Sequence, residues 1–280
     1  HLHYMADRSA TIEALVKLVE KGKYFTINRP RQYGKTTLLY LMEKELEKMG
    51  YLVFKISFEG VGDSVFSSEE RFAPAFLKML RRALKQDGEL SQFLSKQTGV
   101  PQTLHGLSDV ITEMTAMAGK NAVLLIDEVD KSSNNQLFLS FLGMLRAKYL
   151  ARNAGEDSTF HAVILAGVHD VKTFKHKIRP EEEQKYNSPW NIAADFEVDM
   201  SFSPHEIGTM LTDYTREKGI RPDIPAVAEQ LHYYTSGYPY LVSKLCKFID
   251  EKIVPRREDR NWSVTDVEAA FRMIADEGYT

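Results

Sequence analysis

Three consecutive residues, Gly34, Lys35 and Thr36, have the types that phosphate chemistry requires. A polyphosphate is bound by backbone N–H groups at the start of a helix, by a cation for its outer phosphates, and by a hydroxyl for the accompanying magnesium ion. Gly34 allows close approach of the backbone, Lys35 is the cation and Thr36 is the hydroxyl. The segment 23–42 predicts a short strand, a tight loop and a helix, which is the context that a phosphate-binding loop needs.

The approach to this triplet departs from the usual pattern G-x-x-x-x-G-K-[ST]. Arg29, followed by Pro30, stands where the pattern has its first glycine. That glycine often adopts a turn conformation that other residues resist. The loop pattern alone therefore leaves two hypotheses equally open, a nucleotide-binding loop and a helix that simply begins with Gly-Lys-Thr. The candidate nucleotide-binding residues of the loop are Arg29, Pro30, Arg31, Gln32, Tyr33, Gly34, Lys35, Thr36 and Thr37.

An acidic motif further along the chain favours the nucleotide. Residues 122–126 are apolar, and the carboxylates of Asp127 and Glu128 follow directly. Such a run is typical of a buried parallel strand, with the acids at its carboxyl end. In P-loop ATPases this is the Walker B strand. Asp127, together with Thr36, would hold magnesium, and Glu128 would polarise the attacking water, with Lys35 as the second catalytic residue. The alternative is a strand that ends in a solvated acidic turn.

Length and composition set the outer bounds. The chain has 280 residues, 43% of them hydrophobic, so it can bury the core of one large domain or of a core domain plus a smaller one. Its net charge of -3 does not indicate nucleic-acid binding. The single cysteine, Cys246, cannot form an internal disulfide, which favours a reducing compartment and hence the cytoplasm. Its apolar surroundings indicate an inert core thiol. No apolar run approaches the ~20 residues of a membrane span, so no membrane association is expected.

Strands and helices alternate in the first 200 residues. We expect a five-stranded parallel sheet sandwiched by helices, with strands near residues 23–28, 51–58, 122–127, 160–167 and 195–200. The helices are expected at 10–21, 35–49, 68–84, 103–118 and 137–150, and polar connections are expected at 85–101 and 152–158. The long separation between Lys35 and Asp127 is typical of the P-loop class in which a further strand lies between the two motif strands.

From Ser203 onwards the pattern is helical only. Ser203-Pro-His-Glu and Thr265-Asp-Val-Glu are capping boxes, and further helices are expected at 226–235 and 240–253. We therefore divide the chain into an ATPase core, residues 1–202, and a helical lid domain, residues 203–280. Gly237-Tyr-Pro-Tyr is either a plain helix boundary or a segment whose Pro239 lies near the nucleotide base.

Three further residues are candidates for the nucleotide pocket. Asp7 and Arg8 precede the first strand and are either a helix cap and a solvated charge or part of the pocket. The third is His169, or its neighbour Asp170, at the end of the fourth strand. One alternative is that it contacts the γ-phosphate or the attacking water, and the other is that it belongs to a plain turn.

These stretches together resemble the AAA-like ATPases of the predicted bacterial AAA-ATPase families, close to the archaeal-type and STAND ATPases. Members of this group commonly have an Arg-Pro-Arg approach in place of the first glycine. The resemblance is carried by residues 4–9, 28–37, 124–130, 166–170, 188–193 and 236–241. It implies ATP and Mg²⁺ as cofactors, with the roles given above for Lys35, Thr36, Asp127 and Glu128. It also implies, in a longer chain, a C-terminal effector domain, and self-association stays an open alternative.

The function expected is slow hydrolysis of Mg-ATP to ADP and phosphate, which drives a conformational switch. Two alternatives stay open. One is a signalling module that binds nucleotide without hydrolysing it. The other is a DNA-associated ATPase whose basic stretches, 172–179 and 256–260, contact phosphates.

Overall fold

The computed structural model describes residues 4–85, 88–132, 136–168, 200–256 and 258–277. The chain divides into two compact units. The first, called the sheet unit here, contains residues 12–30 and 35–197, and the second, the helical unit, contains residues 1–11, 31–34 and 198–280. The helical unit thus includes two segments from the first part of the chain. They are the N-terminal residues 1–11 and residues 31–34, which lie within the expected phosphate loop.

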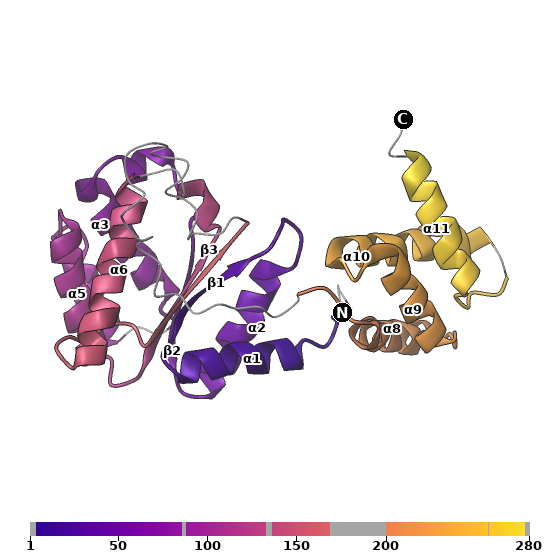
Figure 1. Cartoon of the computed structure of the whole chain (residues 1–280), viewed down its shortest axis with the longest axis horizontal. Coiled ribbons are helices and arrows are strands. Elements are labelled where there is room, and N and C mark those ends of the chain that lie inside the picture. Colours follow the sequence, from indigo (N-terminus) through magenta and orange to yellow (C-terminus); the bar gives the residue numbers. More distant parts are fainter. Residues whose placement is uncertain (1–3, 86–87, 133–135, 169–199, 257, 278–280) are drawn as a thin grey trace. The chain divides into compact units, whose positions relative to one another are not determined.

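The described strands form one parallel sheet with the order β1-β4-β3-β2 (Figure 1). The strands are β1 (Tyr24–Asn28), β2 (Leu52–Ser57), β3 (Ala122–Asp127) and β4 (Ala162–Gly167). Strand β4 lies between β1 and β3, as the spacing of the two motifs predicts. This sheet has four strands rather than the five expected, and the expected fifth, residues 195–200, lies outside the described residues apart from Met200.

The two central strands are buried along their whole length. Every residue of β3 and of β4 is buried, because helices cover both faces of the sheet. Figure 1 shows α5 and α6 on one side of the sheet and α1 and α2 on the other. This explains why these strands are continuous apolar runs without polar alternation. Phenylalanines fill the core around them, and the ring centroids of Phe72 and Phe76 lie 5.0 and 4.9 Å from that of Phe141.

The helices of the sheet unit agree with the sequence pattern except in one segment. They are α1 (Ser9–Glu20, whose first turn belongs to the helical unit), α2 (Lys35–Lys48), α3 (Glu69–Ala83), α4 (Glu89–Gln97), α5 (Leu104–Met117) and α6 (Gln136–Ala154), with short 3₁₀ turns η1 (Asp63–Ser67) and η2 (Val129–Ser132). The expectation of a polar connection at 85–101 was wrong, because α4 forms there. Leu94 is fully buried, and Leu90 and Phe93 pack partly buried against the same core. Helix α6 also continues to Ala154, so the expected loop at 152–158 is shorter.

A buried polar triangle lies beside α6, before strand β4 begins. The Lys148 ammonium is 2.6 Å from a carboxylate oxygen of Asp157 and 2.6 Å from the hydroxyl of Thr112. That hydroxyl in turn donates to the other carboxylate oxygen of Asp157, at 2.7 Å. Burial alone would raise the pKa of Asp157, but the hydrogen bonds and charge of Lys148, with Thr112, outweigh it and hold the pKa below its ordinary value.

The helical unit contains four α-helices among its described residues. They are α8 (Pro204–Lys218), α9 (Ile224–Thr235), α10 (Pro239–Phe248, continued by η4, Ile249–Ile253, and η5, Val254–Arg256) and α11 (Val264–Glu277). The expected capping box of Ser203 and Glu206 is present at the start of α8. The box expected at Thr265 was displaced by two residues: Ser263 caps α11 by bonding to the carboxylate of Asp266, at 2.7 Å from its N–H and 2.8 Å from its hydroxyl.

Close backbone packing explains the glycine of the Gly237-Tyr-Pro-Tyr segment. Gly237 has a φ of 71°, and a Cβ on it would lie 2.1 Å from the carbonyl oxygen of Phe202. The N–H of Phe202 donates to the Gly237 carbonyl at 2.7 Å.

The single cysteine of the chain, Cys246, lies in the same helical unit and packs against its core. Burial raises the pKa of its thiol to about 12, which is consistent with the inert thiol that was expected. None of the described helices combines the length and the hydropathy that a bilayer span requires.

Candidate functional site

A tight connection joins strand β1 to helix α2. Strand β1 ends at Asn28 and α2 begins at Lys35. The Lys35 ammonium turns back toward the strand and donates to the carbonyl oxygens of Arg29, at 2.8 Å, and of Pro30, at 3.0 Å. Lys35 is only 7% exposed. The cation is therefore held by two neutral acceptors at the amino end of a helix, where phosphate oxygens can replace them.

The backbone of the loop shows why Arg29 is tolerated where the usual pattern has glycine. Left-handed conformations occur at Gln32, with a φ of 63°, and at Gly34, with a φ of 75°, and Arg29 does not have a positive φ. The N–H of Arg29 instead continues the sheet by donating to the Gly167 carbonyl at 3.1 Å. An extended residue needs no glycine. The departure from the pattern thus leaves the strand-to-loop geometry unstrained at that position.

The two motifs meet at the carboxyl edge of the sheet. The hydroxyl of Thr36 donates to one carboxylate oxygen of Asp127 at 2.6 Å, and the N–H of Glu128 donates to the other at 2.9 Å. Asp127 is 5% exposed, whereas Thr36 and Thr37 lie on the exposed side of the first turn of α2. The hydroxyl and the carboxylate expected to share a metal ion are therefore in direct contact.

Glu128 has an unusual backbone. Its φ is 56°, so it lies in the left-handed region that residues with a side chain rarely adopt. The following residue, Val129, is completely buried and begins the turn η2. At Glu128, which is partly exposed, the chain passes from strand β3 into the turn η2, while Asp127 stays buried in the sheet.

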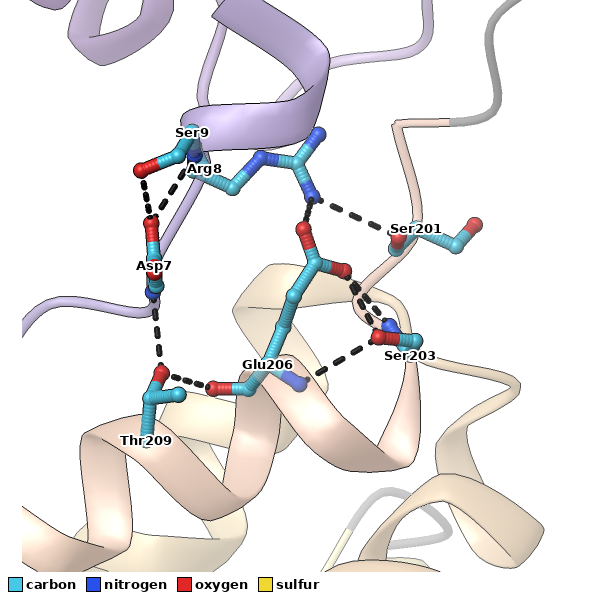
Figure 2. A network of polar contacts seen from close by, with 7 residues as sticks. All are labelled: Asp7, Arg8, Ser9, Ser201, Ser203, Glu206 and Thr209. Atoms are coloured by element: carbon cyan, nitrogen blue, oxygen red, sulfur yellow. Dashed lines mark hydrogen bonds and ion pairs between the residues drawn. The ribbon is translucent and has the colours of Figure 1, made fainter.

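Asp7 and Arg8 lie against the start of helix α8 (Figure 2). The guanidinium of Arg8 is 3.1 Å from the Glu206 carboxylate, 3.4 Å from the Ser201 carbonyl and 5.4 Å from the ring centroid of Phe202. Its side chain is 8% exposed, so the alternative of a solvated charge is wrong for Arg8.

Asp7 has the capping role that was one of its two alternatives. Its carboxylate accepts from the N–H of Ser9 at 2.9 Å and from the Ser9 hydroxyl, and these bonds lower its pKa. Its own N–H donates to the Thr209 hydroxyl at 2.9 Å, on helix α8 (Figure 2). Asp7 and Arg8 together therefore fix the N-terminal segment to this helix.

Within the helical unit, Tyr238 contacts residues 31–33. Its hydroxyl donates to the Arg31 carbonyl at 2.9 Å, and its ring stacks on Tyr33 with the centroids 4.7 Å apart. Pro239, one residue later, is buried at the start of α10. His169 and Asp170, the other pocket candidates, lie outside the described residues.

Two residues of this region had no role in the sequence interpretation. Tyr238 belongs to a segment that was singled out for its proline. Asp130, the last acid of Asp127-Glu128-Val129-Asp130, bonds through its carboxylate to the N–H of Val168. The only signal for Asp130 was its place in that acidic motif, since its partner, Val168, directly follows strand β4, far along the chain.

Comparisons with known proteins agree with this geometry. Residues 2–256 match the model of a family described as an AAA-like domain. Among curated proteins, none matches this chain in sequence.

Solved structures show the same fold at low sequence identity. A Walker-type ATPase of Pyrococcus abyssi is 12% identical with a TM-score of 0.59, over 97% of this chain and 72% of that protein. The ORC2 protein of Aeropyrum pernix in its ADP form is 12% identical with a TM-score of 0.55, over 95% of this chain and 68% of that one. The ORC1 protein of the same organism, in complex with DNA, is 11% identical with a TM-score of 0.51, over 96% and 66%.

Proposed function

Because the chain belongs to the family of AAA-like domains, as its motifs implied, we propose that it binds Mg-ATP at residues 29–37 and hydrolyses it to ADP and phosphate. The fold is that of a P-loop ATPase. The observation that carries the proposal is the 2.6 Å hydrogen bond from Thr36 to Asp127, which joins the two motifs. A helix start with Lys35 and a strand end with two acids are the protein groups that a nucleotide with its metal needs.

The donor set fits a magnesium ion. A hydroxyl and a carboxylate are hard oxygen donors, and Mg²⁺ typically takes one or two carboxylates together with substrate phosphates. In the part of the chain that the structure describes, no three His, Cys, Asp or Glu side chains converge on a common point. Thr36 and Asp127 would therefore hold the ion jointly with nucleotide oxygens. When bound, it neutralises charge on the β- and γ-phosphates.

Lys35 supplies the mobile cation. In the structure its ammonium is bound to the Arg29 and Pro30 carbonyls, and moving to phosphate oxygens exchanges neutral acceptors for charged ones. The exchange involves rotation of the flexible Lys35 side chain at the start of helix α2. We assign Lys35 to stabilising the charge that develops on the transferred phosphoryl group.

Glu128 is assigned to the attacking water. Its carboxylate accepts a hydrogen bond from the water, whose oxygen attacks the γ-phosphorus as the bond to the bridging oxygen of ADP breaks. Asp127 is buried and is bonded to Thr36 and to the Glu128 N–H, so we assign its carboxylate to the metal ion and not to the attacking water.

The proposal also includes contacts outside the two motifs. Asp7, Arg8 and Pro239 are assigned to the nucleotide pocket through the resemblance, and hydrolysis is assigned to drive a conformational switch. Pro239→Ala tests the first assignment, because loss of a base contact should weaken ATP more than inorganic triphosphate. Equal effects on both ligands would remove Pro239 from the pocket.

Calorimetry and phosphate release test the function directly. The wild type should bind ATP in the presence of magnesium and release phosphate slowly. Removing the Lys35 charge in Lys35→Ala costs charge-assisted hydrogen bonds and should weaken binding by about 10-fold to 100-fold. Glu128→Gln should bind ATP as the wild type does and release no phosphate. No uptake of an adenine nucleotide by the wild type would refute the proposal.

The same assays separate the two alternatives. A module that signals by binding alone would bind ATP but release no phosphate, and Glu128→Gln would then change nothing. A DNA-associated ATPase would bind DNA in a salt-dependent manner and hydrolyse ATP faster in its presence. If neither effect appears at low salt, the DNA-associated alternative fails.

A further inference from the structure

One peptide bond, between Gly167 and Val168, links the phosphate loop to the acidic motif. Its carbonyl oxygen accepts from the N–H of Arg29 at 3.1 Å. Its N–H, which belongs to Val168, donates to the carboxylate of Asp130. The carbonyl of Arg29 in turn accepts from the Lys35 ammonium at 2.8 Å. Three hydrogen bonds thus run from Lys35 to Asp130, and all of these residues belong to the sheet unit.

The space around this peptide admits no side chain. A Cβ placed on Gly167 would lie 2.9 Å from Val129 Cγ2 and 3.0 and 3.1 Å from the two carboxylate oxygens of Asp130. Val129 is completely buried. The turn that follows Glu128 is therefore packed directly on the last residue of β4, and any shift of Asp130 must move that turn or the peptide.

The hydrogen bond to Asp130 lies just beyond the strand pairing of the described residues. Strand β4 pairs with β3 only as far as Leu165 and Ile126, and with β1 as far as Gly167 and Asn28. Val168 lies one residue beyond this pairing. The Asp130 carboxylate consequently supplies a side-chain acceptor where the ladder ends, and a charged acceptor makes this a strong bond.

We propose that Asp130 is a positioning residue for ATP hydrolysis: by holding the Gly167–Val168 peptide, it sets both the Arg29 carbonyl that receives Lys35 and the turn that follows Glu128. This inference rests on the proposed function. Asp130 itself contacts neither nucleotide nor metal in this assignment. Its effect should therefore appear in the rate of the chemical step and leave nucleotide affinity largely intact.

The test compares Asp130→Ala, which removes the acceptor, with Asp130→Asn, whose amide oxygen can still accept from Val168. In Asp130→Ala, loss of a bond to a charged group should lower kcat by about 10-fold to 100-fold. Its ATP affinity and its half-saturating magnesium concentration should stay within about 3-fold of the wild type. A tenfold change in either quantity would indicate a lost contact to the nucleotide or to the metal. Asp130→Asn should recover most of the rate. Hydrogen exchange should show the Val168 amide exposed in Asp130→Ala and protected in Asp130→Asn.

Asp157→Ala is the matched control. It removes another partly buried carboxylate of the sheet unit that bonds to a partner, the Lys148 ammonium, at 2.6 Å. It should lower stability while kcat of the folded protein stays unchanged. If Asp130→Ala and Asp157→Ala lower kcat alike, Asp130 has only a structural role and the inference is overturned.

Other outcomes have equally definite meanings. A higher magnesium requirement in both Asp130 variants would make Asp130 a metal ligand, and an unchanged kcat in Asp130→Ala with an exposed Val168 amide would show that the peptide need not be held. Either result overturns the inference and leaves the proposed function standing. A wild type that releases no phosphate refutes the proposed function and removes the reaction that Asp130 would serve.

Discussion

Glycine at position 128 should stabilise the fold and abolish hydrolysis at the same time. Glu128 has a φ of 56°, in the left-handed region. A residue with a side chain pays about 1–2 kcal/mol for that conformation, whereas glycine loses about 0.5–1 kcal/mol more backbone entropy on folding. The difference predicts that Glu128→Gly raises the free energy of unfolding by about 0.5–1 kcal/mol. The same change removes the carboxylate assigned to the attacking water.

Glu128→Gln is the matched comparison for this prediction. It keeps the strained backbone and lacks the carboxylate, so it should lose phosphate release yet stay within about 0.5 kcal/mol of the wild type in stability. Urea unfolding followed by circular dichroism measures all three proteins. A gain of this size corresponds to an increase of about 1–4 °C in the midpoint of thermal unfolding.

Two results would refute the reasoning at different points. If Glu128→Gly is no more stable than Glu128→Gln, the left-handed backbone at residue 128 does not lower the free energy of unfolding. If Glu128→Gly still releases phosphate at the wild-type rate, Glu128 does not act on the attacking water. Ser236→Gly serves as a reference for the backbone effect alone, because Ser236 has a φ of 49° in the helical unit.

Three further predictions concern metal binding, the buried ion pair and a crowded glycine. Thr36→Val should weaken magnesium-dependent ATP binding by about 10-fold, since it deletes an oxygen ligand, and Thr36→Ser should retain binding in calorimetry. Lys148→Met leaves Asp157 without its cation and should cost about 3 kcal/mol in urea unfolding at neutral pH. Because the folded-state pKa of Asp157 is lowered, its contribution is complete above the ordinary pKa of 3.8 and is lost as the pH falls through the folded value, so the cost should shrink in acid. Gly237→Ala should lower the stability of the helical unit by about 2 kcal/mol or more, measured by hydrogen exchange, because its Cβ would overlap the carbonyl of Phe202.

The parallel sheet and the strand-loop-helix connection from β1 to α2 could be predicted because their signals are local. An unbroken apolar run such as residues 122–126 has few interpretations other than a buried strand, and Gly34-Lys35-Thr36 at a strand-to-helix connection combines residue types that one chemistry explains. The presence of a further strand between the two motif strands was expected from the length of chain between the motifs. Such features depend on neighbouring residues, so the sequence contains what is needed to infer them.

The errors occurred where distant residues decide the outcome. Helix α4 is short, and its helical state depends on packing Leu90, Phe93 and Leu94 against the core of the sheet unit. At the start of α11 two overlapping capping patterns, at Ser263 and at Thr265, compete, and local pattern alone does not choose between them. Arg8 and Glu206 are 198 residues apart in the sequence, and neither segment contains a local pattern that indicates their ion pair.

The pairing of β1 with β4 has a consequence for how the protein is made. Tyr24 leaves the ribosome well before its strand partner, Val163, has been synthesised. Helix α2 can form from local contacts, but strand β1, which orients the first turn of α2, cannot pair until β4 has been synthesised. Until β4 is synthesised, the nascent polypeptide exposes an apolar strand with no neighbour, and chaperone binding during translation should concentrate on that interval.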